Sequence, residues 1–224
     1  WSASGTEGGP TIASMGALQR SVRASRRALH LLLFLGVAVA CSPAPEGAAG
    51  GSSSPAPPGR LEVVWGAERG ERVDPMPRAG DPATLWVFIG VDCPVANGYA
   101  PELRAIGARC GELGARMLLV HVDPTVDAAA AAAHGLEYGL EASVVLDPDH
   151  RLVRHVGATV TPEAAVFDGD GALRYLGRID DRYPALGSRR AEAGSTELRD
   201  ALEAVAGAGG VVPEARPAVG CLIE

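Results

Sequence analysis

Residues 83–103 read ATLWVFIGVDCPVANGYAPEL, and this stretch predicts a buried strand that passes into a helix through a cysteine-proline pair. The apolar run at 83–91 is typical of a buried strand, and Pro94 suits the first turn of a helix, where its missing N–H costs no hydrogen bond. Apolar residues at helical spacing continue the predicted helix over 94–113. Cys93 is therefore expected at a helix N-terminus, where free N–H groups and the helix dipole favour a nucleophilic thiolate.

A second informative stretch, at residues 156–168, reads VGATVTPEAAVFD. It places Pro162 at the start of an apolar strand, and the DGDG turn at 168–171 leads into a further strand over 172–176. Turn residues between two apolar runs predict a β-hairpin.

The rest of the chain alternates between expected strands and helices. Strands are predicted at 116–122 and 143–146, and helices at 126–138 and 197–206. This alternation, closed by the hairpin, predicts an α/β fold with a central mixed β-sheet and helices on both faces.

Residues 61–224 resemble the thioredoxin-like superfamily, and within it the redoxin branch related to alkyl hydroperoxide reductase and thiol-specific antioxidant proteins. The resemblance is to secreted or lipid-anchored bacterial redoxins, and it rests on four motifs: CPVANGYAPE at 93–102, TPEAAVFD at 161–168, GRIDDRY at 177–183 and VGC at 219–221. It implies a thioredoxin-like fold in which Thr161–Pro162 is a cis peptide bond and Pro162 packs beside Cys93.

Two departures from better-known relatives narrow the expected chemistry. Thioredoxins carry Cys-x-x-Cys, whereas Ala96 occupies the place of the second cysteine, which excludes a dithiol cycle within the motif. Peroxiredoxins carry a proline and a threonine where this chain has Trp86 and Gly90, so the hydroxyl that orients a peroxide is missing. We therefore expect thiol–disulfide exchange by Cys93 with protein thiols or disulfides and an external thiol reductant. Reduction of a hydroperoxide is the alternative enzyme activity.

A different class, a redoxin-fold binding, assembly or copper-handling module, stays open. Copper-handling relatives pair two nearby cysteines with a distant histidine, ligands that soft copper ions favour, whereas the Cys93 loop has one cysteine. His121 is expected in the core, and His134, His150 and His155 at surface or turn positions. Neither a metal site nor a cofactor is predicted.

Further residues complete the candidate site, in which Thr161 accompanies Pro162. Asn97 is the only asparagine in the chain, which suggests a specific need, although a first-turn asparagine also commonly bonds its own backbone. Arg178 either stabilises a thiolate or bound anion, or forms a salt bridge within its loop.

Cys221 is the internal candidate for resolving a mixed disulfide or sulfenic acid formed on Cys93. Cys110 falls in the apolar stripe of the predicted helix and is expected to be a buried core thiol. The competing interpretation is that Cys221 pairs with another protein or only packs the end of the segment 211–224.

Residues 1–40 are interpreted as an N-terminal extension with a secretory signal peptide starting at Met15. A basic segment precedes an apolar run of about a dozen residues, and Ala38-Val39-Ala40-Cys41 resembles a bacterial lipobox, which implies a lipid on Cys41. Residues 41–60 are rich in Pro, Gly and Ser and are expected to form a flexible tether to a redoxin domain at 61–224. The expected location is the cell envelope, on the periplasmic or extracellular side, with the lipid holding the protein at the membrane.

The charge balance argues against nucleic acid as a partner. The whole chain has 20 basic and 27 acidic residues, and residues 1–40 contain four arginines and one glutamate. The remainder therefore carries 16 basic and 26 acidic residues, a net charge of −10, which repels a phosphate backbone.

Overall fold

The computed structural model describes residues 61–65 and 71–224, with side chains from residue 74 onward. The expected signal peptide, the lipid-attachment residue Cys41 and the tether lie outside these residues. None of the helices in the described part of the chain is long and apolar enough to cross a membrane.

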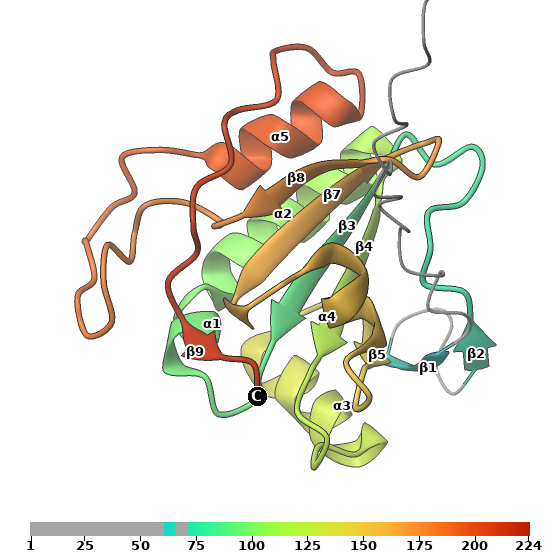
Figure 1. The fold of residues 1–224 in the computed structure, drawn as a ribbon, viewed down its shortest axis with the longest axis vertical. Helices are drawn as coiled ribbons and strands as arrows, with labels where there is room; N and C mark the ends of the chain where they lie inside the picture. The colour runs from blue at the N-terminus through green and yellow to red at the C-terminus, as the bar shows by residue number, and fades with distance from the viewer. Residues whose placement is uncertain (1–60, 66–70) are drawn as a thin grey trace, which may run out of the picture. The chain divides into compact units, whose positions relative to one another are not determined.

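A mixed sheet of seven strands, in the order β2-β1-β5-β4-β3-β7-β8, lies at the centre of the domain (Figure 1). The strands are β1 (Leu61–Trp65), β2 (Glu71–Val73), β3 (Ala83–Ile89), β4 (Arg116–His121), β5 (Ser143–Leu146), β7 (Glu163–Asp168) and β8 (Leu173–Gly177). The central strands β3, β4 and β5 are parallel, whereas β7, β8, β1 and β2 each pair antiparallel with their neighbours. A separate two-stranded sheet pairs β6 (Val160–Thr161) with β9 (Cys221–Leu222).

Helices cover both faces of the sheet, as the sequence predicts. Every residue of β3 is buried, with Leu85, Val87 and Ile89 in one core cluster and Trp86 and Phe88 in the other. The first cluster packs against α2 (Ala100–Leu113), α3 (Ala128–Tyr138) and α5 (Glu197–Val205), and the second against α4 (Arg151–Val156). A parallel strand covered on both faces reads as a continuous apolar run, which is why the stretch at 83–91 is so apolar.

The prediction of one helix over 94–113 is wrong, because the chain forms α1 (Pro94–Gly98) and α2, which meet at Tyr99. Pro101 has no N–H to donate to the carbonyl of Asn97, and its ring crowds that carbonyl. The proline therefore interrupts the helical hydrogen bonds immediately after α1.

The sequence did not suggest the short helix α4, which a buried carboxylate stabilises. Asp147 is fully buried, and its carboxylate accepts the N–H groups of Arg151, Leu152 and Val153 at 2.7, 2.9 and 3.1 Å. These donors are helix-end N–H groups that have no partner within the helix. Burial raises the pKa of Asp147, and the three hydrogen bonds oppose that rise.

Candidate active site

A cavity of about 370 Å³ lies where β3 and β4 end. The loop after β3 lines it with Gly90, Val91, Asp92 and Cys93, and the loop after β4 with Val122, Asp123 and Pro124; His150, Thr161 and residues 221–224 complete it. Loops at the carboxyl ends of parallel strands are the usual place for a binding site in an α/β sheet. The structure therefore brings Cys93, Thr161 and Cys221 to one cavity.

Cys93 lies at the N-terminus of α1, as expected. Its backbone is extended (φ −82°, ψ 107°), and its Sγ accepts the N–H of Ala96 at 3.4 Å. When protonated, the thiol donates to the carbonyl oxygen of Thr161 at 3.0 Å. The Thr161–Pro162 peptide bond is cis, as the resemblance implies.

The C-terminal segment 207–224 returns to this site as a strand. In β9, Cys221 pairs antiparallel with Thr161 of β6, and Ile223 donates its N–H to the carbonyl of Thr159 at 3.0 Å. Gly220 seats the segment closely, because a Cβ there would lie 1.9 Å from the carbonyl oxygen of Thr161. The C-terminal segment therefore lies at the end of the sheet that carries Cys93.

The two thiols differ in their ionisation. Burial alone raises the pKa of Cys93, but hydrogen bonds from the Cys221 thiol, the Thr161 side chain and the N–H groups of Ala96 and Cys221 hold it below its ordinary value. The pKa of Cys221 is raised to about 11 by burial, by its hydrogen bond to Cys93 and by repulsion from that thiolate. Cys93 is therefore the thiol of the pair that ionises first, and Cys221 keeps its proton to higher pH.

Three consecutive residues anchor α1 to the rest of the domain. Asn97 donates to the carbonyl of Val91 at 2.8 Å and contacts His134 of α3, so it holds the active-site loop rather than only its own helix. Gly98 lies against the hydroxyl of Tyr183, where a Cβ would come within 2.0 Å. The Tyr99 hydroxyl donates to the Asp180 carboxylate at 2.6 Å.

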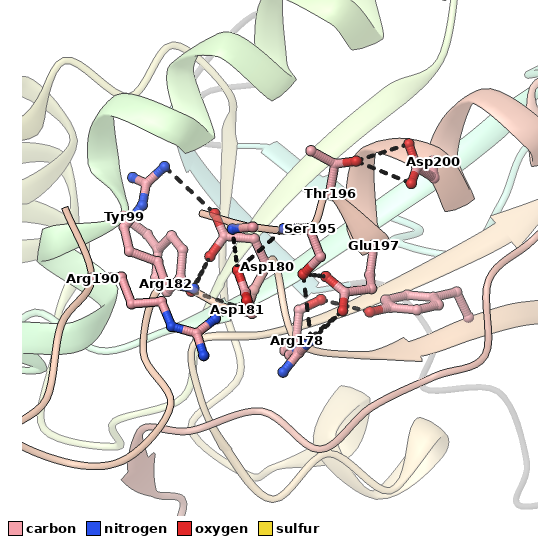
Figure 2. Close-up of polar contacts among 12 residues, drawn as sticks. Tyr99, Arg178, Asp180, Asp181, Arg182, Arg190, Ser195, Thr196, Glu197 and Asp200 are labelled. Atoms are coloured by element: carbon pink, nitrogen blue, oxygen red, sulfur yellow. Dashed lines mark hydrogen bonds and ion pairs between the residues drawn. The ribbon is translucent and has the colours of Figure 1, made fainter. Parts of the chain in front are cut away.

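Figure 2 shows the polar cluster that extends from Tyr99 along the 178–200 segment. Arg178 lies in it, donating from Nε to Glu197 at 2.9 Å and from a terminal nitrogen to Ser195, and it does not line the Cys93 cavity. Of the two interpretations of Arg178, the structure favours the salt bridge within the loop. The Arg178 and Ser195 hydrogen bonds outweigh the opposing effect of burial and lower the pKa of Glu197.

The remaining predicted residues lie partly as expected. Cys110 is buried at 2% exposure, and burial raises its pKa to about 12, so it is a core thiol. His121 is buried as predicted, but the surface assignment of His134 is wrong, because its side chain packs beneath α1 at 6% exposure. The only sequence signal for that contact was Asn97 itself. Among residues 74–224, no cluster of three or more His, Cys, Asp or Glu side chains is arranged to hold a metal ion.

No protein-family model matches the sequence, and neither does any curated protein. Solved structures do match. An uncharacterised conserved protein from Geobacillus kaustophilus is 24% identical, with a TM-score of 0.60 over 74% of this chain and 87% of its own. A hypothetical protein from Sinorhizobium meliloti 1021 is 23% identical, with a TM-score of 0.55 over 66% of this chain and 88% of its own.

The chain has a thioredoxin-like fold. Its mixed sheet, its helices on both faces, its cysteine at a helix start and the cis peptide bond before Pro162 agree with the fold expected from the sequence. A secreted disulfide oxidoreductase of Mycobacterium tuberculosis also matches, at 16% identity and a TM-score of 0.45, over 66% of this chain and 94% of its own.

Proposed function

We propose that this protein is a thiol–disulfide oxidoreductase of the redoxin type, with Cys93 as the nucleophile and Cys221 as the resolving cysteine. One observation carries the proposal: β9 pairs Cys221 with Thr161, the residue whose carbonyl lies 3.0 Å from the Cys93 sulfur. The lowered pKa of Cys93 supports its role, because the thiolate attacks disulfides.

In the proposed cycle, the Cys93 thiolate attacks one sulfur of a substrate disulfide. A Cys93–substrate disulfide forms, the substrate disulfide breaks, and the other substrate sulfur leaves as a thiolate. The Cys221 thiol then loses its proton to solvent and attacks the Cys93 sulfur, which releases the second substrate thiolate and leaves a Cys93–Cys221 disulfide. Two molecules of an external thiol reduce that disulfide and are themselves joined in a disulfide, so each turnover carries two electrons.

The different pKa values of the two thiols suit this order of events. Cys221 donates to the Cys93 thiolate and is repelled by it as an anion, and both effects raise the Cys221 pKa in addition to burial. Both effects end when Cys93 enters a mixed disulfide, because its sulfur is then neutral. Cys221 thus becomes easier to deprotonate at the step that requires its thiolate.

Peptide mapping under non-reducing conditions tests the cycle. Mild oxidation of the protein is expected to give a peptide that joins Cys93 to Cys221, and a Cys221→Ser variant is expected to accumulate the mixed disulfide with substrate. Cys110→Ser is the matched control, since Cys110 is a buried thiol that does not line the cavity. Oxidised Cys93 beside a free Cys221 thiol would show instead a one-cysteine enzyme that depends on an external thiol.

Peroxide reduction is the second candidate, and one contact favours it. A Cβ on Gly90 would lie 3.7 Å from the Thr161 hydroxyl, so Thr161 places a hydroxyl near the position where peroxiredoxins carry their threonine. In that reaction the Cys93 thiolate takes one oxygen from a hydroperoxide, forming a sulfenic acid and an alcohol, and condensation with Cys221 releases water. Turnover of a hydroperoxide with a thiol reductant distinguishes the two enzyme activities.

A binding or assembly module is distinguished by the pH dependence of Cys93 alkylation. Such a module has no need of a reactive thiolate, so an ordinary thiol pKa for Cys93 would favour it. A lowered pKa together with disulfide turnover supports the enzyme.

We further propose that the protein is held at the outer side of a bacterial membrane by a lipid on Cys41. The lipobox-like sequence and the Pro/Gly/Ser-rich residues after it support this proposal. Replacing Cys41 with Ser is expected to release the protein from the membrane fraction, whereas Ser42→Ala is expected to leave it there. Retention of the Cys41 variant would contradict lipid anchoring.

A further inference from the structure

The position of Cys93 depends on a helix that is too short to be stable alone. The five residues of α1 cannot form a stable helix in water without tertiary contacts. Asn97 joins α1 to the active-site loop: its Nδ2 donates to the carbonyl of Val91, two residues before Cys93, at 2.8 Å. Its Oδ1 lies 2.8 Å from Nε2 of His134 on α3.

Simple hydrogen-bond chemistry assigns the proton on His134. The carbonyl of Val91 can only accept, so the NH₂ group of Asn97 faces it and the amide oxygen faces His134. An amide oxygen also only accepts, so Nε2 of His134 must carry the hydrogen. In the neutral ring Nδ1 is then a bare acceptor, and it has no hydrogen-bond partner among the described residues.

The surroundings keep this histidine neutral. His121 packs against it in a T-shaped arrangement, with ring centroids 5.2 Å apart, and the Tyr138 ring lies 4.9 Å away. Burial lowers the pKa of His134, which the charges of Glu137 and Asp92 oppose only in part. A neutral, buried ring in one tautomer is suited to holding Asn97 rather than to exchanging protons.

We propose that His134 is a positioning residue for the Cys93 site: through Asn97 it holds Val91 and α1 so that the start of the helix faces the Cys93 sulfur. This inference concerns the same site as the proposed function. It rests on that function only in taking Cys93 as the cysteine that carries out thiol–disulfide exchange. The two hydrogen bonds of Asn97 join the loop before Cys93, the helix after it and α3 at one side chain. Without the His134 donor, the Asn97 amide is free to rotate away from Val91.

The test is the alkylation rate of Cys93 as a function of pH, followed by mass spectrometry of the Cys93 peptide in the full chain. His134→Leu removes the donor and is expected to raise the Cys93 pKa, slowing alkylation at pH 7 about two- to fivefold, the range expected for a weakened helix-end interaction. His134→Gln supplies an N–H donor and is expected to restore most of the rate. His155→Leu is the matched control, because this half-buried ring packs on Trp86 and Phe167 in the other core cluster.

A purely structural role for His134 would lower the unfolding midpoint without moving the pH profile, and that result overturns the proposal. So does an equal shift of the profile in His134→Leu and His155→Leu. If His134→Leu does not fold, ¹⁵N spectra of the unaltered protein decide, since a His134 ring with its proton on Nδ1 contradicts the hydrogen bond to Asn97. If the His134 variants shift the alkylation profile as expected but the protein does not turn over disulfides, the proposed function is contradicted and this inference stands.

Discussion

Replacing Gly220 with Ala is expected to weaken the Cys93–Cys221 disulfide while the domain stays folded. The added Cβ would lie 1.9 Å from the carbonyl oxygen of Thr161 and 2.6 Å from its carbon, whereas an ordinary contact begins at 3.4 Å. The backbone of β9 must therefore move by about 1.5 Å, the difference between 3.4 and 1.9 Å. The atoms that the added Cβ would meet belong to the backbone of Thr161 and Pro162, so no flexible side chain can move aside to make room.

The size of the effect follows from how sharply reactivity depends on position. A misplacement of 1 Å costs roughly 100-fold in the effective concentration of two reacting groups. Such a loss makes the disulfide about 100-fold less favourable, which raises its reduction potential by about 60 mV for a two-electron couple. Gly220 lies outside the seven-stranded sheet, and its neighbours Cys221 and Ile223 are only partly buried against the two core clusters, so the domain is expected to stay folded.

The assay is a redox titration against glutathione, with the Cys93–Cys221 disulfide quantified by mass spectrometry. Gly111→Ala is the matched control, because a Cβ on this helical glycine meets nothing within 4 Å. A Gly220→Ala midpoint within about 15 mV of the unaltered protein, a factor of about three in the equilibrium, would refute the claim that close seating of β9 sets the disulfide.

Three further changes test the surroundings of the site. Burial lowers the pKa of His121 in the folded protein to about 4 from 6.5, so between these pH values the unfolded chain binds a proton that the folded protein does not, and stability falls as the pH falls. In His121→Leu, the loss of stability between pH 6.5 and pH 4, measured by urea denaturation, should be smaller by about 3 kcal/mol. Gly98→Ala puts a Cβ 2.0 Å from the Tyr183 hydroxyl and should cost about 1–3 kcal/mol, and adding Tyr183→Phe should recover part of it; additive losses in the double variant would contradict the contact. Asp147→Asn can no longer accept all three N–H groups of α4 and should lower stability by about 2 kcal/mol, with faster amide exchange in α4 as the specific readout.

Local patterns in the sequence predicted much of the fold. The apolar run of β3, the position of Pro94 and the turn between β7 and β8 each depend on neighbouring residues, because strand period, helix start and turn geometry are short-range properties. The break between α1 and α2 was also present locally, in Pro101, but the helical spacing of the apolar residues on either side obscured it. The short helix α4 has no comparable signal, because the carboxylate that stabilises its start is a single buried side chain.

What the sequence by itself determined was the reactive half of the site: a cysteine at a helix start and a proline at a strand start, both placed by their immediate neighbours. Only the tertiary structure decided the other half. Cys221 stands 128 residues after Cys93, and the two meet because Gly220 allows one backbone to lie against another, a contact that no periodicity records. The same holds for Asn97 with His134, and for Arg178 with Glu197, since a polar side chain takes its partner from whichever distant segment packing brings within hydrogen-bond reach.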